Sequence, residues 1–149
     1  MSDFNILFAN EARRWAVKKI PYRHMGTTEK GCDCTGLIIG VLNKLGKIKK
    51  YKLKKYKFDW NIHSGASDII TEELLKIGDF VFDRKIGDLF VFRFGKCNSH
   101  VGVFLGGYQF AHSVSHARYC QIGIVKNSMW HKRLTGVIRL NEEKMAQYT

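Results

Sequence analysis

The chain has 149 residues, 45% of them hydrophobic and 13% aromatic, so it is long enough to bury a core and too apolar to be a disordered segment. It carries 25 Lys and Arg against 13 Asp and Glu, a formal net charge of +12 that favours an anionic partner such as nucleic acid, an acidic membrane surface or a cell-wall polymer. It contains no apolar run of membrane-spanning length and too few cysteines for a small disulfide scaffold. We therefore expect one globular domain over residues 1–149.

The N-terminal region predicts two helices joined by a loop. Residues 3–19 have the spacing of an amphipathic helix, which Pro21 ends. Asp33 suits an N-cap, so a second helix is expected to begin at Cys34 and to end near Gly46, with an apolar face formed by Leu37, Ile38, Val41, Leu42 and Leu45. The start Met1–Phe4 lacks the features of a Sec signal, which predicts synthesis in the cytoplasm with reduced thiols.

Lysines dominate residues 44–57, where apolar and aromatic side chains are interleaved with them. This composition predicts a segment that lies on the core. It leaves two interpretations open, a solvated face that keeps the protein soluble or an anion-binding surface.

The second half of the chain predicts a sheet. Ser67 and Asp68 open a short helix closed by Gly78, and short runs rich in β-formers follow at residues 80–82, 88–92, 100–105, 108–112, 121–125 and 134–140. Gly106-Gly107 is typical of a hairpin turn. Helices followed by an antiparallel meander of five to six strands indicate an α+β fold.

Three residues of this arrangement suggest catalysis. Cys34 lies at a predicted helix N-terminus, whose partial positive charge favours a thiolate. His100 and His112 lie on strands that flank the predicted hairpin, so antiparallel pairing brings them together. A cysteine that faces a pair of histidines is typical of a catalytic unit, in which the cysteine is the nucleophile, one histidine is the base and the other histidine orients the base.

Several short motifs then resemble one family in the order in which that family carries them. Asp33-Cys34-Thr35-Gly36-Leu37 resembles the Asp-Cys-Ser/Thr-Gly-Leu signature of the NlpC/P60 cysteine peptidases, and residues 87–92, 99–103 and 110–112 resemble their Gly-Asp-Leu strand, their Ser-His-Val-Gly-Ile motif and the strand of the third polar residue. Pro21-Tyr22 matches the tyrosine upstream of the nucleophile. The chain is similar to the NlpC/P60 peptidases found in phage tails and gene transfer agents in three segments: Pro21–His24, the following Gly31–Cys34, and Phe58-Asp59-Trp60.

This resemblance implies a papain-like fold and hydrolysis of the D-γ-glutamyl–diaminopimelate bond of peptidoglycan stem peptides, without a metal or organic cofactor. It implies catalysis by Cys34, His100 and His112, with Tyr22, Asp33 and Ser99 placed for substrate or oxyanion contacts. The backbone N–H of Cys34 is a natural oxyanion donor at the helix start. We also expect action in the periplasm or cell wall after delivery by a phage-like particle, with tail proteins as partners. No nucleic-acid partner is expected.

Two alternatives stay open. Cys32, Cys34, Cys97 and His100 could form a zinc site in a structural or nucleic-acid-binding module. The same Cys-His groups could also serve an amidase, an acyltransferase or a toxin that acts on another amide.

Overall fold

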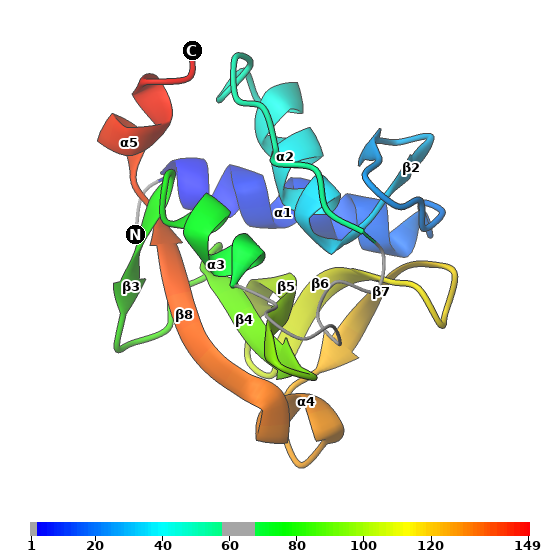
Figure 1. Ribbon diagram of the computed structural model, residues 1–149. Coiled ribbons are helices and arrows are strands. Elements are labelled where there is room, and N and C mark those ends of the chain that lie inside the picture. Colours follow the sequence, from blue (N-terminus) through cyan, green and yellow to red (C-terminus); the bar gives the residue numbers. More distant parts are fainter. Residues whose placement is uncertain (1–2, 58–67) are drawn as a thin grey trace.

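The computed structural model describes residues 3–57 and 68–149, and Figure 1 labels their helices and strands. Phe58-Asp59-Trp60 and Ser67, which carry part of the sequence argument, lie outside the described residues. Helix α1 (Asp3–Val17) is followed by a two-stranded hairpin, β1 (Thr27–Thr28) and β2 (Gly31–Cys32), which the sequence analysis did not predict. Helix α2 (Cys34–Lys44) and the short α3 (Ile69–Leu74) come next.

Helix α2 begins and ends for the predicted reasons. Asp33 has extended backbone and its carboxylate accepts a hydrogen bond from the Gly36 N–H at 2.8 Å, so it is the N-cap. Gly46 has a φ of +81°, the left-handed conformation that ends helices, and its N–H donates to the Asn43 carbonyl at 3.0 Å. Helix α1 ends two residues earlier than predicted, at Val17.

Six antiparallel strands form the main sheet in the order β3-β8-β4-β5-β6-β7. Their bounds are β3 (Gly78–Val81), β4 (Leu89–Phe94), β5 (Cys97–Gly106), β6 (Gln109–Val114), β7 (Tyr119–Ile124) and β8 (Leu134–Leu140). The predicted strand count and antiparallel pairing are confirmed, but the strands do not form a simple meander, because β8 lies between β3 and β4. Gly78, expected to close a helix, instead starts β3. Gly106 pairs with Gln109, so the two residues of the hairpin turn are Gly107 and Tyr108 rather than the two glycines.

The sheet separates two apolar layers. Leu89, Val91, Val101 and Val103 belong to the main core with α1 and α2, which lie together along one side of the sheet in Figure 1. The alternate side chains Phe90, Phe92, Phe104 and Phe110 form a second, aromatic cluster, against which Trp130 of the short helix α4 (Met129–Arg133) packs. Helix α5 (Glu142–Ala146) closes the chain. No helix in the described part of the chain is long and apolar enough to span a bilayer.

Candidate active site

Cys34 stands on the wall of a pocket, at the first position of α2. The residue is buried, with 8% of its surface exposed, and its sulfur lies 4.0 Å from the Ser99 carbonyl oxygen and 3.9 Å from Thr35 Oγ1. Burial and the adjacent Asp33 carboxylate raise the pKa of the Cys34 thiol to about 12. Desolvation and the charge of the capping residue therefore oppose the stabilisation of a thiolate that the helix N-terminus was expected to provide.

His100 and His112 meet as predicted, although they do not sit directly opposite each other. Val103 pairs with Ala111, so the two histidines are offset diagonally by two residues on neighbouring strands. His100 Nε2 lies 2.8 Å from His112 Nδ1, a hydrogen-bonding distance. Burial and the nearby His116 lower the pKa of His100 to about 3, and burial also lowers the pKa of His112. Both rings are therefore neutral at physiological pH.

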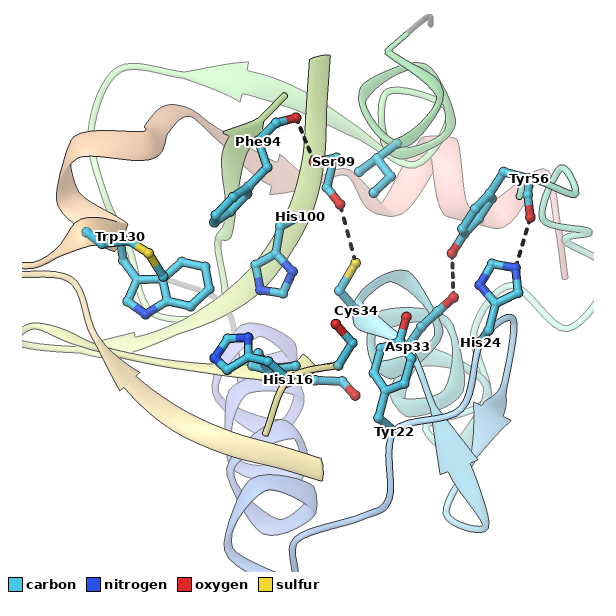
Figure 2. A pocket seen from close by; sticks show the side chains of 15 residues that line it. Tyr22, His24, Asp33, Cys34, Tyr56, Phe94, Ser99, His100, His116 and Trp130 are labelled. Carbon is cyan, nitrogen blue, oxygen red and sulfur yellow. Dashed lines mark hydrogen bonds between the residues drawn. The ribbon is translucent and has the colours of Figure 1, made fainter. Parts of the chain in front are cut away.

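One arrangement of the protons leaves His100 able to act as a base. If His100 donates its Nε2–H to His112 Nδ1, then His100 Nδ1 keeps a lone pair for the thiol proton. His112 then carries its own proton on Nε2, which is buried and has no hydrogen-bond partner among the described residues. In Figure 2 the His100 ring lies between Cys34 and Trp130.

Trp130 is the residue that encloses this histidine pair. Its ring centroid lies 5.1 Å from that of His100 and 4.7 Å from that of His112, and it also contacts Phe92, Phe94 and Phe110. This aromatic wall covers one side of the pair, so that His112 is fully buried while His100 stays partly exposed to the pocket. Trp130 thus also lines the pocket.

The three residues expected to contact substrate or an oxyanion all line the pocket, with different chemical capacities. Tyr22 presents its ring near Cys34, and burial raises the pKa of its hydroxyl, so it stays a neutral donor. The Asp33 carboxylate accepts bonds from Gly36 and Met25 backbone N–H groups at 2.8 Å. Since a carboxylate only accepts, Asp33 shapes the helix start and cannot stabilise an oxyanion.

Ser99 contacts Cys34 with its backbone rather than its side chain. Its hydroxyl donates to the Phe94 carbonyl at 3.3 Å, while its own carbonyl faces the Cys34 sulfur. A carbonyl can accept a hydrogen bond from a substrate N–H but cannot donate to an oxyanion. The Cys34 N–H and the Tyr22 hydroxyl therefore remain as the expected oxyanion donors.

The pocket has a volume of about 440 Å³ and includes residues that the sequence analysis did not select. Among them are His24, Tyr56 and His116. His24 lies two residues after Tyr22, and His116 lies four residues after His112. Nearness in sequence to these predicted site residues was the only feature that could have pointed to His24 or His116. Tyr56 follows a run of lysines and gave no such signal, because only the folded chain carries it back to the start of α2.

The four residues of the alternative zinc site are not gathered around one point. Cys32 Sγ lies 3.5 Å from Cys120 Sγ in the core, whereas the Cys34 sulfur faces the pocket. Cys97 is buried on β5 outside the pocket-lining set. In the part of the chain that the structure describes, no three His, Cys, Asp or Glu side chains are grouped to hold a metal ion.

Comparison with known proteins decides the family. A family model described as the NlpC/P60 family matches residues 19–139, which include Tyr22, Cys34, His100 and His112. The chain belongs to the NlpC/P60 family.

Two curated NlpC/P60 relatives illustrate the range of the match. The chain is 33% identical over 119 residues to the probable peptidoglycan endopeptidase LytE of Bacillus subtilis, covering 80% of this chain and 30% of that protein. It is 28% identical over 122 residues to the murein DD-endopeptidase MepS/murein LD-carboxypeptidase of Escherichia coli, covering 78% of this chain and 53% of that protein. The chain thus spans about a third to a half of the length of these relatives.

Solved NlpC/P60 structures confirm the predicted fold. A lipoprotein-like NLP/P60 protein of Staphylococcus aureus superposes with a TM-score of 0.66 at 21% identity, over 94% of this chain and 42% of the other. The NlpC/p60 domain of the peptidoglycan hydrolase SagA superposes with a TM-score of 0.62 at 19% identity, over 91% and 98% of the two chains. A third neighbour, RipD of Mycobacterium tuberculosis, is described as a non-catalytic NlpC/p60 protein adapted to peptidoglycan binding, with a TM-score of 0.55 at 16% identity over 90% and 96%.

Proposed function

We propose that residues 1–149 form one catalytic unit, a cysteine endopeptidase that hydrolyses an amide bond in the stem peptides of peptidoglycan. The observation that carries the proposal is that Cys34 and His100 line one pocket side by side (Figure 2), with His100 hydrogen-bonded to His112 at 2.8 Å. Cys34 is the nucleophile, His100 the general base and His112 the orienting residue.

The pKa values of the site favour one order of proton transfer. With the pKa of Cys34 raised to about 12 and that of His100 lowered to about 3, the proton stays on sulfur in the free enzyme. We therefore expect no stable thiolate–imidazolium pair before substrate arrives. The thiol turns from the Ser99 carbonyl toward His100 Nδ1, and transfer of its proton accompanies attack on the substrate carbonyl.

The remaining steps follow from the same groups. The oxyanion of the tetrahedral intermediate lies near the Cys34 N–H and the Tyr22 hydroxyl. His100 returns the proton to the leaving amine, which departs and leaves a thioester on Cys34. A water molecule, deprotonated by His100, then attacks the thioester carbonyl, and the thiol is restored.

We propose the D-γ-glutamyl–diaminopimelate bond as the target, from the resemblance of the motifs around Cys34 and His100 to the NlpC/P60 peptidases. The names of the relatives include an endopeptidase, a DD-endopeptidase and an LD-carboxypeptidase, so relatives of this chain differ in the bond they cut. Action at the cell wall and delivery by a phage-like tail, with tail proteins as partners, belong to the same proposal. They are supported by the similarity of Pro21–His24 and Gly31–Cys34 to the phage-type members.

Digestion of purified diaminopimelate-type sacculi by wild type, Cys34→Ala and Cys32→Ala tests this function, with fragments identified by mass spectrometry. We expect stem-peptide fragments ending in D-glutamate from wild type and from Cys32→Ala, whose sulfur packs against Cys120, and none from Cys34→Ala. Fragments cut at the cross-link would identify a DD-endopeptidase instead.

Two further outcomes would redirect the proposal. Equal digestion by wild type and Cys34→Ala would refute catalysis by Cys34. Retention of the protein on sacculi without any cleavage would favour a binding role of the kind described for RipD. Neither binding nor cleavage would direct the search to another amide substrate.

A further inference from the structure

Residues 47–57, which we call the basic segment, follow α2 and lie along the protein surface (Figure 1). Apolar side chains fix the segment to the core at intervals: Ile48 is fully buried, Tyr51 is 8% exposed, and Leu53 packs on the main cluster. The Tyr51 hydroxyl also donates to the buried Glu73 carboxylate. The lysines between these anchors therefore occupy defined places on the surface, in contrast to those of a free tail.

Tyr56 fixes the end of the basic segment to the active site. Its hydroxyl donates to Asp33 Oδ2 at 2.5 Å and lies 3.2 Å from Thr35 Oγ1, and both of these residues belong to the start of the nucleophile helix. Its backbone carbonyl accepts a hydrogen bond from His24 Nε2 at 2.9 Å, and the two rings meet edge to face at 5.3 Å. Figure 2 shows Tyr56 and His24 side by side at the end of the pocket away from Trp130.

The positive charge of the basic segment is not neutralised within the described structure. Elsewhere lysines meet carboxylates, as Lys44 does with Glu11 and Glu29, and Lys144 with Asp79. No ion pair to a described carboxylate is formed by the exposed lysines of the segment, which are Lys49, Lys50, Lys52, Lys54, Lys55 and Lys57. The two acidic residues that the segment does contact, Asp33 and Glu73, are buried and bonded to tyrosine hydroxyls.

An anchored row of cations, none of them ion-paired to a described carboxylate, is placed beside the catalytic pocket, where it can act on the substrate. We propose that the basic segment is a substrate-binding surface beside the catalytic pocket, which attracts the free carboxylates of peptidoglycan stem peptides neighbouring the one being cut. The inference rests on the proposed function. Exposed charges of this kind contribute little one by one and act together over a distance of about 8–10 Å at moderate salt, so a polymer that carries repeated carboxylates fits them better than a single short peptide does.

Matched triple variants test the inference. One carries Lys49→Gln, Lys52→Gln and Lys55→Gln in the basic segment. The control carries three substitutions of exposed lysines that lie outside the segment and the pocket: Lys30→Gln, Lys85→Gln and Lys96→Gln. Both lose the same net charge, and none of the six positions is buried.

Rates are measured on insoluble sacculi at several salt concentrations and on a short soluble stem peptide. We expect the segment variant to cleave sacculi about tenfold more slowly at low salt and to lose most of its salt dependence, while its kcat and KM on the soluble peptide match wild type. The control variant should behave as wild type on both substrates. Equal losses in the two variants, or no loss in the segment variant, would overturn the inference.

Binding separates this inference from the proposed function. The same triple substitutions are placed in Cys34→Ala, and retention of these proteins on sacculi is measured. This assay needs no activity. If wild-type protein proved inactive, the proposed peptidase function would be refuted, but the role of the basic segment could still be tested. Sacculi stripped of attached phosphodiester polymers should still retain the parent protein more strongly than the segment variant. Loss of the difference on stripping would mean that phosphates, and not carboxylates, are the ligand, and would overturn the assignment.

Discussion

Replacement of Asp33 should change stability and thiol acidity in opposite ways. The carboxylate is 2% exposed and accepts three hydrogen bonds, from the N–H groups of Gly36 and Met25 and from the Tyr56 hydroxyl. Loss of an N-cap costs about 1 kcal/mol, and a buried N–H left without an acceptor costs about 1–3 kcal/mol. For Asp33→Ala we therefore expect a loss of about 3 kcal/mol in the free energy of unfolding.

Asp33→Asn removes the charge of the side chain but keeps an oxygen that can cap the helix. The amide oxygen can still accept from Gly36, so the expected loss is about 1–2 kcal/mol. Both variants remove the negative charge that helps to raise the pKa of Cys34, so the thiol should become more acidic. We expect roughly tenfold faster alkylation of Cys34 at a given pH, equivalent to about 1.4 kcal/mol.

Urea unfolding followed by tryptophan fluorescence gives the first quantity, and peptide mapping of iodoacetamide-treated protein gives the second. Asp83→Asn is the matched control, since Asp83 is an exposed carboxylate paired only with Arg139 in the described structure, and we expect it to change neither. An alkylation profile of Asp33→Asn that coincides with wild type would refute the electrostatic part of the reasoning. A loss below 1 kcal/mol for Asp33→Ala would refute the structural part.

Three further predictions concern stability. Between pH 7 and pH 5, the free energy of unfolding in urea should fall by about 1–2 kcal/mol more for wild type than for His100→Gln. The reason is that the histidine of the unfolded chain takes up a proton near its ordinary pKa of 6.5, whereas folded His100 stays neutral until about pH 3. Equal falls in the two proteins would contradict this. Gly36→Ala should prevent folding, as judged by circular dichroism, because the added Cβ would lie 1.7 Å from a backbone oxygen. The control Gly46→Ala has open space around the added Cβ and only an unfavourable φ, so it should lower the free energy of unfolding by about 1 kcal/mol. Arg139→Gln should cost about 3–5 kcal/mol in urea unfolding, because it leaves the fully buried Asp88 carboxylate without its cation; a loss under 1 kcal/mol would argue against that ion pair.

The sequence by itself determined most of the helices and strands and selected the residues that we propose to react. The capping residue, the apolar spacing behind it and the closing glycine are local features, so the start of α2 and the position of Cys34 at that start could be predicted from Asp33 to Gly46. The histidine pair could be predicted because a hairpin makes distance along the chain a guide to distance in space. Short elements without strong periodicity, such as α4 and the β1–β2 hairpin, could not be predicted.

The tertiary structure alone decided the environment of those groups. The acidity of Cys34 depends on how far burial and Asp33 oppose the helix dipole, and the neutrality of His100 depends on the wall built by Trp130, which is 30 residues away in the chain. Tyr56 reaches Asp33 across 23 residues, and no local pattern encodes that contact. Local sequence specifies backbone conformation, whereas desolvation and charge–charge interactions sum over neighbours from the whole fold, which is why the chemistry of this site became visible only in the folded protein.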